Sequence, residues 1–89
     1  MAKKTENLLE LKLIGERLKE LRKTHGYSNY EHIAYELDMS RSAYWRLESG
    51  ENFELKTLIK ICRFLGLTMT EFFEGIDFPR QGKKFKKKL

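Results

Sequence analysis

The sequence predicts a single small domain built only from α-helices. Apolar residues recur at intervals of three and four, as at Leu11, Ile14, Leu18 and Leu21, and no segment shows sustained alternation of apolar and polar residues. A chain of 89 residues is also too short to bury two separate hydrophobic cores. We therefore expect one all-α domain, and its 40% apolar content is ordinary for a folded protein.

A long amphipathic helix and a short one are predicted in the first half of the chain. The first covers about residues 7–24 and ends before Gly26, which can adopt a positive φ. Ser28 and Glu31 have the spacing of a capping box, so we expect the second helix to begin there and to run to Leu37.

A tight turn separates the second helix from the third. Asp38 tolerates left-handed backbone, and Ser40 can cap the helix that follows, which we expect over residues 41–48. Two further helices are expected over residues 55–65 and 68–75, each ending at a glycine.

The positive charge of the chain is concentrated at its C-terminal end. Residues 1–78 contain 12 Lys and Arg against 13 Asp and Glu, whereas residues 79–89 contain six basic residues and no acidic one. We expect three parts: an N-terminal extension of the first helix (1–13), a folded domain (14–78) and a basic, disordered tail (79–89). The net charge of +5 is therefore no argument that the folded domain binds nucleic acid.

The third predicted helix has an unusual outward face. If Tyr44 and Leu47 point inward, helical geometry of about 100° per residue turns four other side chains toward solvent. They are Arg41, Ser42, Trp45 and Arg46. Arginine can bind guanine through two hydrogen bonds, serine can donate or accept, and an aromatic ring can pack on a thymine methyl group or a sugar. The alternative is that Trp45 lies at a helix packing seam and Arg46 is an ordinary surface charge.

Several motifs occur in a fixed order between residues 14 and 76. They are GERLKELR at 15–22, Ile33-Ala34 with Leu37, SRS at 40–42, LESG at 47–50, LKTL at 55–58 and Phe72-Phe73. In this order they closely resemble the Cro and phage-repressor type of helix-turn-helix DNA-binding domain, the XRE-like family. The resemblance implies a compact five-helix, lambda-repressor-like domain in which the second and third helices form the helix-turn-helix.

The same resemblance implies a sequence-specific transcriptional regulator of double-stranded DNA, commonly a homodimer on an inverted repeat, with the third helix in the major groove. The positions that contact bases or the groove edge in the family are Ser40, Arg41, Ser42, Trp45 and Arg46 here. Arg22 and Glu48 fall where the family often has a buried ion pair. The alternative for that pair is an exposed contact that contributes little to stability.

Phosphate contacts are less clearly indicated. The family usually has a glutamine at the start of the second helix, and here the segment from Gly26 is one residue longer, so the candidates are Ser28, Asn29 and Tyr30. The loop over residues 51–54 is acidic where the family is often basic. Phosphate contacts on that side are then expected from nearby polar or basic residues. They are Ser49, Asn52 and Lys56.

Other classes of function find little support in the residues. His25 and His32 have no cysteine or carboxylate at ligand spacing, and no glycine-rich phosphate loop or activated nucleophile is apparent, so we expect no metal, no cofactor and no enzymatic activity. Cys62 lies in an apolar run and is expected to be a buried thiol. A membrane span and a secretory signal are not indicated, which favours a cytoplasmic protein.

Two questions of partnership stay open at this level. Phe72, Phe73, Ile76 and Phe78 exceed what one short helix needs, so they either form a dimer interface or cover one another within one chain. The alternative function is a protein-interaction module on a helix-turn-helix scaffold, such as an antitoxin-like or accessory protein, that binds its partner through Trp45 and these phenylalanines.

The basic tail is a candidate arm for sequence-independent DNA contact. Its basic residues are Arg80, Lys83, Lys84, Lys86, Lys87 and Lys88. The alternatives are a tail that only aids solubility and a tail that contacts an acidic protein partner.

Deletion of the tail should flatten the salt dependence of DNA binding without changing the preferred sequence. Each phosphate that the tail neutralises contributes about 0.9 to the slope of log K against log salt concentration. Titrations of one duplex at several salt concentrations measure that slope, and an unchanged slope would contradict a role as an arm.

Overall fold

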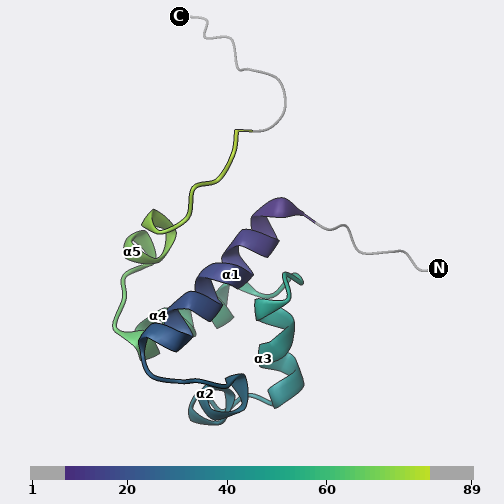
Figure 1. The fold of residues 1–89 in the computed structure, drawn as a ribbon, viewed down its shortest axis with the longest axis vertical. Coiled ribbons are helices and arrows are strands. Elements are labelled where there is room, and N and C mark those ends of the chain that lie inside the picture. Colours follow the sequence, from purple (N-terminus) through teal and green to yellow (C-terminus); the bar gives the residue numbers. More distant parts are fainter. Residues whose placement is uncertain (1–7, 81–89) are drawn as a thin grey trace, which may run out of the picture.

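Five α-helices make up the described part of the chain, residues 8–80 of the computed structural model (Figure 1). They are α1 (Leu9–Thr24), α2 (Tyr30–Glu36), α3 (Arg41–Glu48), α4 (Leu55–Leu65) and α5 (Met69–Glu74). Within residues 8–80 there is no strand, so the all-α prediction is confirmed for this part. None of these helices combines the length and the apolar character needed to cross a bilayer.

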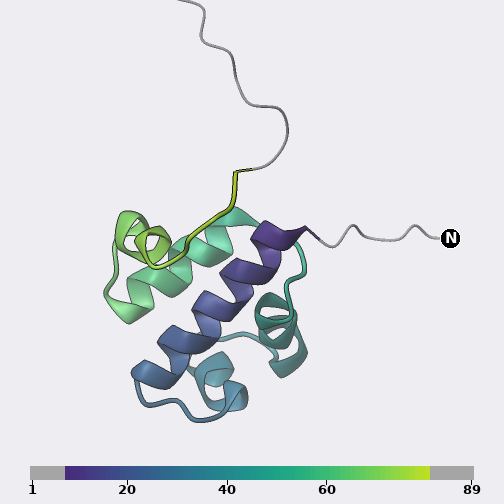
Figure 2. The same cartoon turned by 45° about the horizontal axis from the view of Figure 1, so that its top comes forward.

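The longest helix, α1, runs through the middle of the fold. In Figure 2, α4 and α5 lie on one side of α1 and α3 lies on the other. The core fills the space where the helices meet, and it contains Leu18, Leu21, Ile33, Ala34, Leu37, Tyr44, Leu47, Leu58, Ile61, Cys62, Leu65 and Phe72. Every helix contributes to this one core, so the helix-turn-helix depends on the other three helices for its shape.

The start of α2 differs from the prediction. The capping residue is Asn29, whose side chain accepts a hydrogen bond from the His32 backbone N–H at 2.9 Å, and the helix begins at Tyr30. The predicted capping box of Ser28 and Glu31 is therefore wrong, because the extended backbone that a cap requires falls one residue later. The Glu31 side chain is consequently available for contacts outside its own helix.

The helix α5 is held onto α1 by Arg17. Its Nε donates to the Phe72 carbonyl at 2.8 Å and its Nη2 donates to the Glu71 carbonyl at 3.0 Å, so the guanidinium satisfies carbonyls at the end of α5. Phe72 is fully buried, and Phe73 and Ile76 pack against the core. These C-terminal apolar residues thus cover one another and α1 within a single chain.

A glycine allows α1 and α3 to touch through their backbones. A Cβ atom placed on Gly15 would lie 2.6 Å from the Glu48 carbonyl oxygen and 2.7 Å from the Leu47 carbonyl oxygen. Such distances are far inside van der Waals contact, so α3 ends directly against α1 only because residue 15 has no side chain. The end of α3 is thereby fixed in position by α1.

We expect Gly15→Ala to destabilise the fold by about 2 kcal/mol, because the added methyl group must separate α1 from α3. The sign of the change in the free energy of unfolding is informative, since a Gly→Ala substitution within an unobstructed helix stabilises by roughly 1 kcal/mol. Denaturant unfolding followed by circular dichroism measures the free energy of unfolding. Glu16→Ala, at the next and exposed position, is the control and should change it by less than about 0.5 kcal/mol; a Gly15→Ala variant of increased stability would contradict the close approach.

Candidate nucleic-acid interface

The turn between α2 and α3 is set by two residues. Asp38 has a φ of 60°, the left-handed conformation expected for it, and it reverses the chain after α2. The Ser40 hydroxyl then accepts a hydrogen bond from the Ala43 backbone N–H at 3.0 Å, as expected for the cap of α3. Both ends of this turn are therefore specified by local chemistry.

The two faces of α3 differ as the helical periodicity predicts. Tyr44 and Leu47 are buried in the core. The side chains on the opposite side are exposed: Arg41, Ser42, Trp45 and Arg46. Trp45 is 48% exposed, so it is no core residue, and the helix presents two cations, a hydroxyl and an indole to solvent.

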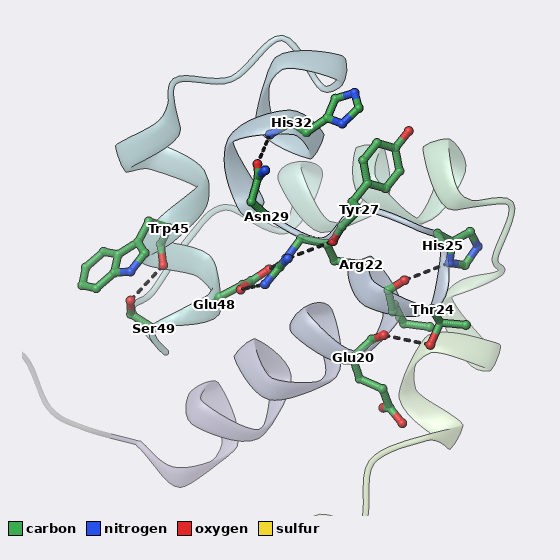
Figure 3. Close-up of polar contacts among 11 residues, drawn as sticks. Glu20, Arg22, Thr24, His25, Tyr27, Asn29, His32, Trp45, Glu48 and Ser49 are labelled. Atoms are coloured by element: carbon green, nitrogen blue, oxygen red, sulfur yellow. Dashed lines mark hydrogen bonds and ion pairs between the residues drawn. The ribbon is translucent and has the colours of Figure 1, made fainter.

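A buried ion pair joins α1 to the last residue of α3. Arg22 donates from Nε to Glu48 Oε2 at 2.7 Å and from Nη2 to Oε1 at 3.2 Å, which is a two-point contact between planar groups. Its Nη1 donates to the Tyr27 carbonyl at 2.9 Å (Figure 3). The hydrogen bond to Glu48 raises the pKa of Arg22, whose side chain is only 4% exposed. One guanidinium therefore fixes α1, the loop before α2 and the end of α3 relative to one another.

The Tyr44 hydroxyl lies near this pair. Tyr44 is completely buried, and its hydroxyl has no hydrogen-bond partner within residues 8–80. Burial raises the pKa of this hydroxyl, and the negative charge of Glu48 raises it further. The tyrosine is thus held in its neutral form on the buried side of α3.

A hollow of about 370 Å³ opens beside α3 and brings together several of the predicted site residues. Its lining consists of Lys19, Arg22, Lys23, Ser28, Tyr30, Trp45, Glu48 and Ser49. The lining thus includes both members of the buried ion pair, three hydroxyl side chains, the Trp45 indole and two lysines. The hollow therefore offers donors to an anion immediately next to the exposed face of α3.

Lys19 and Lys23 are the residues of this hollow that the sequence did not single out. Along α1 they alternate with acidic residues, which is ordinary for a helix surface. The available signal was their spacing from Arg22, at three positions before it and one after it. Because Arg22 faces α3, neighbours on that side of α1 must lie close to α3 as well.

Three other candidates lie apart from the hollow. The Asn29 side-chain oxygen is already used as the cap of α2. Asn52 and Lys56 are exposed in the loop after α3 and in the first turn of α4, and neither lines the hollow. In the tail, Arg80 is exposed, whereas Lys83, Lys84, Lys86, Lys87 and Lys88 lie outside the described residues.

Cations on and next to the exposed face of α3 are paired with carboxylates of the same chain. Arg41 Nη1 donates to Glu31 of α2, and this hydrogen bond raises the pKa of Arg41. Arg46 Nε lies 3.9 Å from Glu51 Oε1, at the limit of an ion pair. The third pair joins Lys56 Nζ and Glu54 Oε1 at 3.7 Å. The acidic loop is thus partly neutralised by the cations beside it.

Comparison with known proteins assigns the fold to a family. A helix-turn-helix family model matches residues 18–72, which is more than half of the chain. The control protein C.MunI of a Mycoplasma species is 38% identical over 64 residues, covering 71% of this chain and 86% of that protein. The chain belongs to the helix-turn-helix family of the Cro and phage-repressor type, and it is a DNA-binding transcriptional regulator.

Within residues 8–80, no group of three or more His, Cys, Asp or Glu side chains is placed to hold a metal ion.

The buried Tyr44 predicts a loss of stability at high pH. Because burial raises its pKa, the folded state holds the phenolic proton more tightly than the unfolded state, whose tyrosine pKa is about 10. The neutral Tyr44 makes its full contribution to the free energy of unfolding below pH of about 10. Above that pH the contribution is lost, at up to about 1.4 kcal/mol per pH unit. Tyr44→Phe removes the ionisable group, so the wild type should lose stability relative to this variant as pH rises from about 9 to 11.

Urea unfolding at several pH values tests this relation. Tyr35→Phe is the matched control, because it removes the same hydroxyl from a side chain that is 80% exposed. A stability difference between wild type and Tyr44→Phe that stays constant across this range would contradict the buried neutral tyrosine.

Proposed function

We propose that this regulator reads a specific duplex sequence by placing α3 in the major groove. The carrying observation is the outward face of α3, which holds two arginines, a serine and a tryptophan and contains no acidic side chain. An α-helix fits the width of the major groove, and arginine side chains there bind guanine O6 and N7 with two hydrogen bonds. The buried contact between Arg22 and Glu48 supports the proposal because it holds this face at a fixed angle.

The hollow beside α3 is proposed to take a backbone phosphate. Lys19 and Lys23 supply positive charge and Ser28 supplies a hydroxyl donor within the same hollow, whereas the Ser49 hydroxyl already donates to the Trp45 carbonyl at 2.8 Å. Contacts of this kind fix the register of a protein on DNA but carry no sequence information. In this arrangement Trp45, at the boundary between the hollow and the face of α3, packs against a sugar or a thymine methyl group.

The remaining phosphate contacts are proposed from the resemblance to the family. They are Asn29 and Tyr30 at the start of α2, and Asn52 and Lys56 after α3. The tail cations from Arg80 to Lys88 are retained as a non-specific arm. Each of these contacts would strengthen binding to any duplex and steepen its salt dependence.

Binding as a homodimer to an inverted repeat is proposed from the behaviour of the family, because a two-fold protein matches a two-fold site. Leu8 and Leu9 at the start of α1 are 46% and 42% exposed and belong to the apolar surface available for such contact. A cytoplasmic location stays a prediction, and we propose no catalytic role.

The rival function, a protein-interaction module, loses part of its basis. It relied on C-terminal phenylalanines as a docking surface, and Phe72 is fully buried. The acidic loop, which favours the rival because carboxylates repel phosphates, has its Glu51 and Glu54 paired with Arg46 and Lys56. Exposed Trp45 is compatible with either function.

Selection from random duplexes tests the proposed function most directly. Recovery of a preferred half-site gives the specificity, and a second half-site at fixed spacing gives the dimer geometry. Recovery of no preferred sequence, with binding as weak as that of any polyanion, would favour the rival.

Arg46→Ala should reduce discrimination at one base position of the selected site by about 1 to 3 kcal/mol, because its guanidinium then no longer contacts that base pair. Binding of duplexes with single substitutions, followed by Trp45 fluorescence or by anisotropy, locates the position at which preference is lost.

Lys23→Gln is the matched comparison. It also removes one positive charge, but from the hollow instead of the α3 face, so it should weaken all duplexes uniformly and lower the salt slope by about 1. If Arg46→Ala gave the same uniform loss, its contact would be with phosphate and not with a base.

A further inference from the structure

The ion pair between Arg41 and Glu31 is the closest contact made by any cation on the exposed face of α3. It joins the first residue of α3 to the first turn of α2, ten positions apart in the sequence. Both side chains are exposed, at 66% and 57%, so the pair lies at the surface where DNA would approach. Glu31 does not cap α2, since Asn29 does. Its carboxylate is instead directed to the start of the reading helix.

The pair uses only part of the Arg41 guanidinium. Nη1 donates to Glu31, and no hydrogen bond from Nε or Nη2 occurs within residues 8–80. A guanidinium has five N–H donors in a planar fork, so one edge of it stays open while Glu31 is bound. Arg41 can therefore bind a second acceptor without giving up the first.

Phosphate oxygens and base atoms are different kinds of hydrogen-bond acceptor for Arg41. A phosphate oxygen is an anionic acceptor like the Glu31 carboxylate, so a phosphate gains little by replacing it and is repelled by the displaced charge. Guanine O6 and N7 are neutral acceptors, and they can take hydrogen bonds from the open edge while Glu31 neutralises the cation. The carboxylate therefore opposes contact with the DNA backbone more than contact with a base.

We propose that Glu31 is a specificity-determining residue, which shields Arg41 from DNA phosphates and leaves it free to read a base. The inference rests on the proposed function, because it requires α3 to enter the major groove. Its consequence is that Glu31 weakens binding to arbitrary DNA more than binding to the preferred site. Glu51 acts in the same direction on Arg46 but more weakly, since that pair is separated by 3.9 Å.

The test compares Kd values for the duplex recovered by selection and for a duplex of the same length with its sequence scrambled. Glu31→Gln keeps the shape of the side chain and removes its charge. It should tighten binding to the scrambled duplex by about twofold to fivefold at low salt and bind the selected duplex with a smaller gain. The ratio of the two Kd values then falls, and Glu51→Gln should give the same change with smaller size.

Glu20→Gln is the matched control. Glu20 is also an exposed carboxylate paired with an arginine, Arg17, at 3.2 Å, and it lines a different hollow, next to Gly75. The change in net charge is the same as in Glu31→Gln. Because Glu20 is paired with Arg17 and not with a cation on the face of α3, this variant should leave the ratio of the two Kd values unchanged.

Three results would overturn the inference. An unchanged ratio in Glu31→Gln overturns it alone, provided that the wild type prefers the selected duplex. Equal falls in the ratio for Glu31→Gln and Glu20→Gln show a general effect of charge and also overturn it. A wild type without preference for any duplex overturns the proposed function and this inference together.

Discussion

The position of α3 depends on one buried contact, the two-point hydrogen bonding of Arg22 to Glu48. A charge removed from water needs a partner and filled hydrogen bonds, and Arg22 has both, through the Glu48 carboxylate and the Tyr27 carbonyl. Because such a pair stabilises little when compared with apolar residues of the same size, its value lies in geometry. It determines where α3 ends relative to α1, and hence how the exposed face is aimed.

The other features of the site follow from this position of α3. The hollow beside α3 is lined by the ion pair, and Lys19 and Lys23 line it as well because they flank Arg22 on α1. The Tyr44 hydroxyl is buried near the same pair, and burial together with Glu48 raises its pKa. Surface cations further out, on the face of α3, are balanced by carboxylates of α2 and of the following loop. The interior charges thus form a buried pair, whereas the cations on the face of α3 form exposed pairs.

Residues that act locally could be predicted from the sequence, whereas contacts between distant segments could not. Ser40 caps α3 and Asp38 adopts left-handed backbone, since each depends on its immediate neighbours. The start of α2 was misplaced by one residue because Ser28 and Asn29 are both good caps, and the choice depends on how the loop is held by Arg22. The exposure of Trp45 follows from helical periodicity. The pairing of Glu31 with Arg41 requires the angle between α2 and α3, which no local pattern contains.

The absence of a side chain at Gly15 has a consequence for the DNA. In the proposed binding mode, the backbone contact of α1 with α3 at that point and the pair of Arg22 with Glu48 oppose any rotation of α3 to suit a groove of different width or curvature. Any mismatch in angle must be taken up by bending or twisting of the duplex, and the free energy of that deformation depends on the base steps involved. In that binding mode the regulator would sense the flexibility of base pairs that it does not touch.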